Sequence, residues 1–315
     1  MSDDVKDINE KEPNTEQQAA VVGMKEKNIE TVAKKQVVMK VLVQIALYGF
    51  LTIMAIVVLF PFYWMLMSSV KTIPEYNESI PTLWPQQFKW SNYVTAFTGE
   101  LNLGRLFLNT CIVGVVSTLL SLVVTVLSAY AFARLDFKGK NTLFAALLAT
   151  MMIPGELFTI TNYVTVSNFN WLNTFTALIV PFLVSVFYIF LLRQNFMQIP
   201  NELYLAAKVD GTSDLKYLWK VMIPLSAPTL ISITILKMMG SWNSYVWPNL
   251  VTTQGGGKWL ITVGLRAAQF ADEAMNPDFP AQMAAVVLVT VPLFLVFLFF
   301  RKYIMRGVSR SGIKG

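Results

Sequence analysis

Long apolar runs alternate with short polar segments along this chain. Three of the runs contain no charged side chain, and each is long enough to cross a hydrocarbon core of about 30 Å as a helix: residues 41–67, 106–133 and 279–300. Three others contain at most one charged residue each: residues 143–164, 174–192 and 225–247. The pattern predicts an all-α integral membrane protein with about six transmembrane helices.

Composition supports the same class. The chain has 315 residues, of which 55% are hydrophobic and only 14% charged, and its mean hydropathy is +0.52. A soluble domain has no place for such long charge-free runs. Residues 1–40 are polar and charged without an apolar run, so they do not resemble a cleaved signal peptide. Because they have little apolar surface to offset the entropy of ordering, we expect a disordered cytoplasmic tail at 1–40 and a transmembrane domain at 41–315.

Basic residues near the ends of the runs predict the orientation, because Lys and Arg are retained on the cytoplasmic side. With six spans, both termini lie on one side of the membrane. If that side is the cytoplasm, fifteen basic residues flank the spans inside and five outside. We therefore expect a multi-pass protein of the bacterial cytoplasmic membrane with both termini inside. The net charge of +6 then reflects topology and needs no nucleic acid to explain it.

Residues that carry enzyme chemistry are scarce. The chain has no histidine and a single cysteine, Cys111, which removes the commonest general base and argues against a metal cluster. Residues 255–258 are Gly-Gly-Gly-Lys, but Trp259 follows where a phosphate loop has Ser or Thr. We predict a chain that is not an enzyme and binds no metal or cofactor itself, so that any ATP and Mg²⁺ are bound by a partner.

A polar segment, residues 201–224, lies between two apolar runs on the predicted cytoplasmic side. Asn201 is a candidate cap for a first helix, and Gly211 can turn the chain through a positive φ after it. Residues 212–214 would then cap a second helix and place an acidic residue, Asp214, in its first turn. In that helix the apolar side chains recur at helical spacing and form one stripe: Leu215, Leu218, Trp219 and Met222. Such a helix lies against a surface, either its own helices or a partner.

Polar residues inside the apolar runs are candidates for a transport pathway. Ionisable side chains are costly there, which singles out Glu156 and Lys237; the alternative is that they pair with each other. A sugar site needs aromatic faces and amides, which are offered by Asn162, Tyr163, Trp242, Asn243 and Tyr245. The alternative for the aromatic residues is an interfacial belt. Lys237 also allows the sharper hypothesis of an acidic substrate, such as a uronate-containing oligosaccharide.

Four segments, in this order, resemble motifs of ABC importer permeases. Residues 205–211, LAAKVDG, followed by residues 223–228, IPLSAP, are similar to the EAA loop, although Leu205 stands where that family usually has Glu. The other three narrow the resemblance to carbohydrate permeases of the maltose type. They are residues 129–141 (AYAFARLDFKGKN, the turn after the second span), 240–250 (GSWNSYVWPNL, a W-N-x-(F/Y)-x-W-P motif) and 307–315 (GVSRSGIKG, the terminal tail).

The resemblance implies a type I ABC importer permease architecture, in which this chain forms half of the pore. It implies that a cytoplasmic ATPase docks on a coupling loop at 201–224 and drives alternating access, through Leu205, Ala206, Ala207, Asp210, Gly211, Leu215, Leu218, Trp219 and Pro224. It implies further ATPase contacts by a tail at 307–315, through Ser311, Gly312, Ile313, Lys314 and Gly315. The implied partners are a second permease subunit in a heterodimer, two ATPase subunits and an extracellular binding protein that delivers carbohydrate.

Two other classes of function remain open from the residues alone. An ion-coupled secondary carrier needs a relay of intramembrane carboxylates, and Glu156 alone is a poor relay. A non-transporting membrane scaffold would explain the spans and the amphipathic segment, but it would not explain four ordered motifs.

Overall fold

The structure, a computed structural model, describes residues 15–99, 102–253, 257–268, 270 and 277–309, with only the helical backbone described at 15–38 and 303–309. The described residues form helices joined by turns and loops, with no β-strand. The helices are α1 (Thr15–Ser69), α2 (Ile73–Tyr76), α3 (Ser91–Thr98), α4 (Leu103–Arg134), α5 (Lys140–Thr150), η1 (Gly155–Phe158), α6 (Thr159–Asn168), α7 (Phe175–Ile179), η2 (Val180–Phe182), α8 (Val186–Met197), α9 (Asn201–Val209), α10 (Asp214–Tyr217), η3 (Leu218–Met222), α11 (Ile223–Leu225), α12 (Ala227–Trp242), α13 (Val246–Val251), α14 (Ile261–Ala267) and α15 (Phe279–Ser309).

The chain divides into two structural units, and the boundary falls within α1 between Trp64 and Met65. The structure describes helical backbone from Thr15 onward, whereas the sequence predicts a disordered tail over 1–40; residues 1–14 lie outside the described residues. Residues 15–40 contain no proline and many Ala, Glu, Gln and Lys residues, which are strong helix formers. Because the apolar run that follows already nucleates a helix, extending it backward is cheap.

Three helical stretches among the described residues are long and apolar enough to cross a membrane: Met39–Ser69 in α1, Leu103–Arg134 in α4 and Phe279–Lys302 in α15. They confirm the three charge-free runs. Three bent pairs pass the same test only when both halves are taken together: α5 with η1–α6 at 85°, α7–η2 with α8 at 47°, and α10–α11 with α12 at 81°. By length and composition the described residues thus provide three spans, or up to six, which includes the expected number.

Prolines stand at each bend. Pro154 precedes η1, Pro181 lies in η2, and Pro224 and Pro228 flank the bend at Ser226; each removes a backbone N–H that a continuous helix would use. The apolar run at 225–247 is not one continuous helix, because α12 ends at Trp242 and α13 begins at Val246. Asn and Ser between them favour turns over helix interiors.

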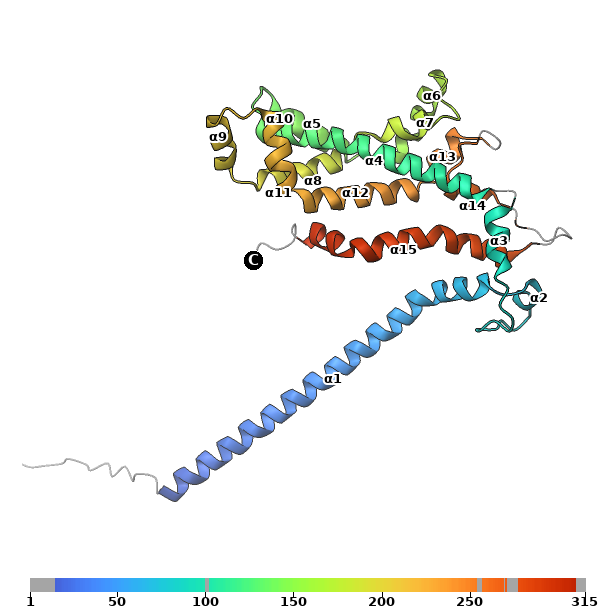
Figure 1. Cartoon of the computed structure of the whole chain (residues 1–315). Helices are drawn as coiled ribbons and strands as arrows, with labels where there is room; N and C mark the ends of the chain where they lie inside the picture. The colour runs from blue at the N-terminus through green and yellow to red at the C-terminus, as the bar shows by residue number, and fades with distance from the viewer. Residues whose placement is uncertain (1–14, 100–101, 254–256, 269, 271–276, 310–315) are drawn as a thin grey trace, which may run out of the picture. The chain divides into compact units, whose positions relative to one another are not determined.

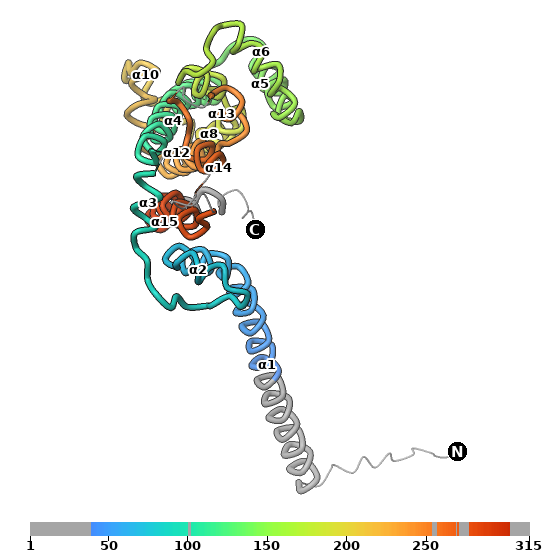
Figure 2. Tube along the Cα trace, turned by 90° about the vertical axis from the view of Figure 1, so that its right-hand side faces the viewer, coloured from blue at the N-terminus to red at the C-terminus, as the bar shows by residue number. Residues whose placement is uncertain are grey.

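Helix α4 is central to the second unit, where it lies alongside α8 and α12, while α15 packs on α12 and α3 (Figures 1 and 2). Small residues on its buried face, Gly114, Ser117 and Ser121 among them, allow neighbouring helices to approach closely. Near its last turns, α4 shares an apolar cluster with α8, α10, η3 and α12. The buried members of this cluster are Ala129, Tyr130, Leu192, Phe196, Tyr217, Leu218, Met222 and Ile233.

The α2–α3 segment, which we define as residues 70–98, joins α1 to α4 and contains a buried carboxylate. Glu75 is 4% exposed and accepts hydrogen bonds from Thr82 Oγ1 at 2.7 Å and from the backbone N–H of Gln86 at 2.9 Å. Lys71 Nζ donates to the carbonyl of Thr82, and Asn92 Nδ2 donates to the carbonyl of Lys71 at 2.8 Å. The segment is therefore folded around its own polar contacts.

Candidate functional site

The α9–α11 segment, residues 201–225, turns at Gly211 as predicted. Gly211 has a φ of +69°, which only glycine adopts without strain. Two backbone hydrogen bonds close the turn. The N–H of Thr212 donates to the carbonyl of Ala207 at 2.8 Å, and the N–H of Gly211 donates to the carbonyl of Lys208 at 3.1 Å. These two bonds satisfy carbonyls at the end of α9.

The predicted side-chain caps of this segment are wrong. Asn201 is the first residue of α9 and not its cap; its Oδ1 accepts a hydrogen bond from Arg134 Nη1 at 3.2 Å. Ser213 precedes α10, but its side chain makes no capping hydrogen bond. A contact with α4 therefore holds Asn201 where local capping was expected.

The predicted apolar stripe divides into two halves. Leu218 and Met222 are fully buried, whereas Leu215 and Trp219 are 60% and 66% exposed. The edge of the helix bundle runs along this stripe, so only half of it finds neighbours within the chain. Leu218, expected to serve for docking or anchoring, is fully buried and anchors the segment.

The exposed half belongs to a larger apolar surface on the α9–α11 segment. We name it the docking face and define it as Leu205, Val209, Leu215 and Trp219, which are between 56% and 88% exposed. Ala206, Asp210 and Pro224 are also exposed, and Ala207 is half-buried. Sequence reasoning did not select Val209, although it lies four residues after Leu205 and so on the same side of α9.

The segment also carries a cluster of polar side chains around Asp214. We define the Asp214 cluster as the residues Asp214, Tyr130, Tyr204 and Lys208. Asp214 Oδ1 accepts hydrogen bonds from Tyr130 Oη of α4 at 2.8 Å and from Tyr204 Oη of α9 at 3.0 Å. Its Oδ2 pairs with Lys208 Nζ at 2.9 Å. The hydrogen bond to Asp214 raises the pKa of Lys208 above its ordinary value. Sequence reasoning identified only the acidic first turn, because Tyr130 is 84 residues away.

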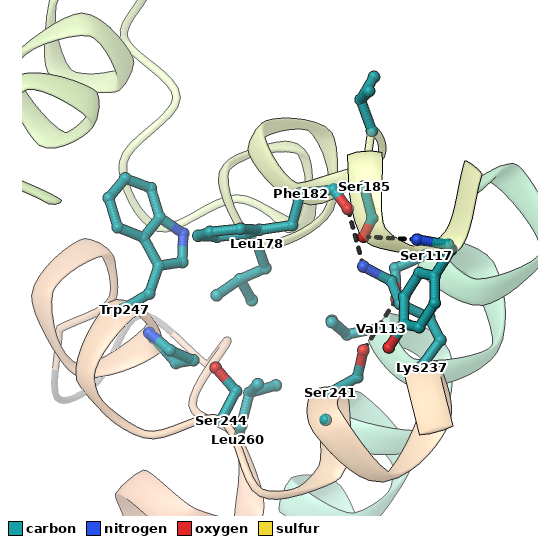
Figure 3. Close-up of a pocket in the computed structure, with 14 residues that line it drawn as sticks. Val113, Ser117, Leu178, Phe182, Ser185, Lys237, Ser241, Ser244, Trp247 and Leu260 are labelled. Atoms are coloured by element: carbon teal, nitrogen blue, oxygen red, sulfur yellow. Dashed lines mark hydrogen bonds between the residues drawn. The ribbon is translucent and has the colours of Figure 1, made fainter. Parts of the chain in front are cut away.

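A second candidate site is a pocket of about 370 Å³ among α4, α7, η2, α8, α12 and α13 (Figure 3). It is lined by Val113, Ser117, Leu178, Phe182, Val184, Ser185, Tyr188, Lys237, Gly240, Ser241, Ser244, Trp247, Pro248 and Leu260. The dashed lines in Figure 3 include Lys237 Nζ to the carbonyl of Phe182 at 2.7 Å and Ser117 Oγ to Ser241 Oγ at 3.1 Å. Hydroxyl groups, an aromatic face and one ammonium group therefore face a common space, which is the chemistry that binds hydroxyl-rich ligands.

Lys237 is the one predicted pathway residue that lines this pocket. It donates to Phe182 and forms no ion pair with Glu156, which is exposed, so the structure does not show the alternative in which these two residues pair with each other. Trp242 is only 5% exposed and meets Phe107 edge to face at 5.4 Å between ring centroids, on another side of α12.

None of the other predicted residues lines the pocket either. Tyr163 packs against an apolar cluster around Val166 and Trp247, and Asn162 is half-buried, while Asn243 and Tyr245 are exposed. The missed residues of the pocket include Ser241 and Ser244. Ser241 follows Lys237 by four positions in α12, a spacing visible in the sequence that puts both on one side of the helix. Ser244 lies just after the end of α12.

Two remaining expectations concern the tail and metals. Residues Ser311 to Gly315 lie outside the described residues. The part of the chain that the structure describes contains no group of three or more His, Cys, Asp or Glu side chains that could hold a metal ion.

Comparison with known proteins gives consistent matches over most of the chain. A family model described as "Binding-protein-dependent transport system inner membrane component" matches residues 121–310. The diacetylchitobiose uptake system permease protein NgcG of Streptomyces coelicolor is 31% identical over 84% of this chain and 87% of that protein. The arabinooligosaccharides transport system permease protein AraQ of Bacillus subtilis is 28% identical over 86% and 96%.

A solved structure has the same fold. It is the crystal structure of a bacterial ABC transporter involved in the import of the acidic polysaccharide alginate, matched with a TM-score of 0.76 and 24% identity over 82% of this chain and 95% of that one. The likeness concerns the arrangement of the helices.

Proposed function

Because this chain belongs to the family of binding-protein-dependent transport system inner membrane components, we propose that it is the permease subunit of an ATP-driven ABC importer for carbohydrates. The observation that carries this proposal is the docking face, an exposed apolar surface on a segment whose other side is buried against α4 and α8. The carbohydrate class is supported by the names of two relatives, which are an uptake permease for diacetylchitobiose and a transport permease for arabinooligosaccharides.

The occupant of the docking face is a cytoplasmic ATPase subunit. Such a partner is needed because the chain has no histidine and no phosphate loop, so the binding of ATP and Mg²⁺ is assigned to the partner. Large exposed side chains such as Trp219 are typical anchors of protein interfaces. Gly211 and Asp210 shape the bend between α9 and α10, and residues 311–315 add a second contact with the ATPase.

The remaining partners follow from the topology. The excess of basic residues on one side supports a topology with both termini and the docking face in the cytoplasm. The α2–α3 segment then faces outward, where an extracellular binding protein delivers the substrate. A second permease subunit completes the conduit as a heterodimer, and two ATPase subunits bind the pair.

The pocket is the proposed passage point for substrate within this chain. Ser117, Ser185, Ser241 and Tyr188 offer hydroxyl groups to a glycan, and Trp247 offers an aromatic ring. Lys237 adds a positive charge, and none of the residues lining the pocket carries a negative one. An acidic glycan would supply the missing anion.

Substitution of Lys237 tests the acidic substrate. We expect Lys237→Met to lower uptake of a uronate-containing oligosaccharide about tenfold, which corresponds to about 1.4 kcal/mol, while uptake of a neutral oligosaccharide of equal length changes less. Lys237→Arg is the matched control, because it keeps the charge and the hydrogen bond to Phe182. Unchanged uptake of every acidic glycan tested in Lys237→Met would exclude this role.

The experiment that tests the proposed function is affinity purification of the tagged chain from native membranes in mild detergent, followed by mass spectrometry. We expect a second permease, an ATPase and a binding protein to be recovered. Trp219→Ala should lower the recovery of the ATPase, whereas Trp84→Ala, which removes a tryptophan of similar exposure (64% against 66%) from the α2–α3 segment, should leave it unchanged.

Recovery of the chain without any ATPase, even after crosslinking at Lys216 or Lys220, would contradict the proposal. An ion-coupled carrier or a non-transporting scaffold would then be the better explanation of the spans. Loss of the ATPase in both tryptophan variants would instead show that the docking face is not specific.

A further inference from the structure

We propose that Asp214 is a positioning residue that makes α4 move with the docking face. This inference rests on the proposed function, since it concerns how a movement of the ATPase reaches the pocket. In the structure, one carboxylate joins three helices: Asp214 of α10 is bonded to Tyr130 of α4 and to Tyr204 and Lys208 of α9.

The covalent route from the docking face into the bundle is bent. The α9–α11 segment continues into α12 through the turn at Ser226, where the helix axes meet at 81°. Pro224 and Pro228 on either side supply no backbone N–H to a helical ladder. A turn of this kind can change its angle when the segment rotates. The covalent link at Ser226 alone therefore does not determine how α12 and α4 move when the docking face moves.

Helix α4 offers a straight route from the Asp214 cluster to the pocket. It is continuous over 32 residues, from Leu103 to Arg134. Tyr130 and Ser117 lie on it thirteen positions apart in the sequence, which is about 20 Å along a helix axis. Ser117 lines the pocket and contacts Ser241 of α12 at 3.1 Å between hydroxyl oxygens. A displacement of Tyr130 is therefore felt at the contact between α4 and α12.

Apolar packing by itself leaves this connection loose. Leu218 and Met222 are buried beside α4 and α8, but packed helices slide past one another in shear movements. A hydrogen bond between Tyr130 and a carboxylate is directional and resists sliding. Arg134 supports the same end of α4, because its Nη2 donates to the carbonyls of Phe196 at 3.0 Å and Ile199 at 2.6 Å.

The test compares two tyrosines that donate to the same oxygen of Asp214. Tyr130→Phe removes the hydroxyl that comes from α4, and Tyr204→Phe removes the one that comes from α9 within the segment itself. Both rings stay in place, so the two variants differ in which helices remain joined. The readout is disulfide formation between Ser117→Cys and Ser241→Cys in a Cys111→Ala background, with copper phenanthroline and oxygen as oxidant. It is measured in the purified complex with and without ATP and vanadate.

We expect ATP and vanadate to change the rate of disulfide formation by about fivefold or more, a modest allosteric coupling. In Tyr130→Phe this change should fall below about twofold, with the ATPase still bound, whereas Tyr204→Phe should behave as the parent. Asp214→Asn, whose oxygen still accepts from both tyrosines, should retain more of the nucleotide response than Asp214→Ala.

Three results with the tyrosine variants would overturn the inference: an unchanged nucleotide response in Tyr130→Phe, equal losses in both variants, or loss of the ATPase from Tyr130→Phe. The second would mean that the cluster only stabilises the α9–α11 segment, and the third that it only shapes the docking face. A parent complex without nucleotide response but with bound ATPase would also overturn it. Absence of any ATPase would contradict the proposed function, and the inference with it.

Discussion

Two carboxylates hold two segments of this protein in different ways. Asp214 accepts hydrogen bonds from α9 in its own segment and also from Tyr130 of α4. Glu75 accepts its hydrogen bonds from Thr82 and from the backbone of Gln86, both within the α2–α3 segment. Asp214 therefore ties its segment to the helix bundle, whereas Glu75 ties its segment to itself.

The two segments are otherwise similar, since each presents a large exposed tryptophan. Trp219 is 66% exposed and Trp84 64%, so apolar surface alone does not distinguish a coupling surface from any other. What distinguishes a coupling surface is the set of contacts that join its segment to the rest of the helix bundle. A force applied at Trp219 reaches α4 through polar bonds, while the α2–α3 segment meets α4 and α15 through apolar contacts such as those of Ala96.

The largest expected effect comes from removing each carboxylate in turn. We expect Asp214→Ala to lower ATP-driven uptake by more than about tenfold, because even one hydrogen bond from Tyr130 to a charged acceptor is worth about 1.5 kcal/mol. Glu75→Ala should leave uptake per folded molecule nearly unchanged. It should instead lower the thermal stability of the purified protein, because Thr82 and Gln86 would lose a buried acceptor.

Uptake and melting temperature of the same preparations check this prediction. The comparison fails if Glu75→Ala lowers uptake as strongly as Asp214→Ala at equal amounts of folded protein. It fails as well if Asp214→Ala acts only through a lower melting temperature.

A somewhat smaller effect is expected from backbone strain in the turn of the α9–α11 segment. Gly211 and Gly139 both have a positive φ, +69° and +80°, and a Cβ at either would meet no atom within 4 Å. Valine at either position should therefore cost a similar amount, about 1–2 kcal/mol of strain. Only Gly211 lies beside the docking face, so we expect Gly211→Val to lower uptake about tenfold and Gly139→Val much less.

Gly211→Asn is the control for strain, because Asn tolerates this conformation better than valine. Normal ATP-driven uptake in Gly211→Val would exclude the turn from coupling. Equal losses in the two valine variants would mean that the strain acts on the whole fold.

The features that sequence predicted well depend on neighbours along the chain. Charge-free runs follow from the cost of burying charge in lipid, and the turn at Gly211 follows from its missing Cβ. The sequence predicted the apolar stripe only half correctly. Periodicity shows which side chains share a face of a helix, but it does not show how much of that face the neighbouring helices cover. Leu218 and Trp219 are adjacent in the stripe and end with opposite exposures.

The features that sequence missed depend on residues far apart or on the direction of a side chain around its helix. Tyr130 and Asp214 meet only because α4 and α10 pack together. Trp242 lies five residues after Lys237, which is about 140° around a helix, whereas Ser241 lies about 40° away. Trp242 therefore points away from the pocket that Ser241 lines. The angle around the helix would have favoured Ser241 over Trp242 as a pathway residue.

The smallest expected effect is a pH dependence that separates the two carboxylates again. Burial by itself would raise the pKa of Glu75, but the hydrogen bonds from Thr82 and Gln86 and the nearby charge of Lys71 lower it below its ordinary value. A carboxyl group whose pKa is lowered by folding stabilises the protein above its unfolded pKa, about 4, and this contribution is lost as the pH falls through the folded pKa.

Acidification should therefore lower the melting temperature of the parent protein more than that of Glu75→Gln, which has no charge to lose at this position. We expect a difference of about 2 °C, the size that about 1 kcal/mol produces in a domain of a few hundred residues. Glu78→Gln, which changes an exposed carboxylate of the same segment, should follow the parent. Parallel melting of Glu75→Gln and the parent, from neutral pH to pH values below the unfolded pKa, would show that Glu75 does not hold the α2–α3 segment through its charge. The two carboxylates would then differ only in the hydrogen bond that Asp214 accepts from Tyr130 of α4.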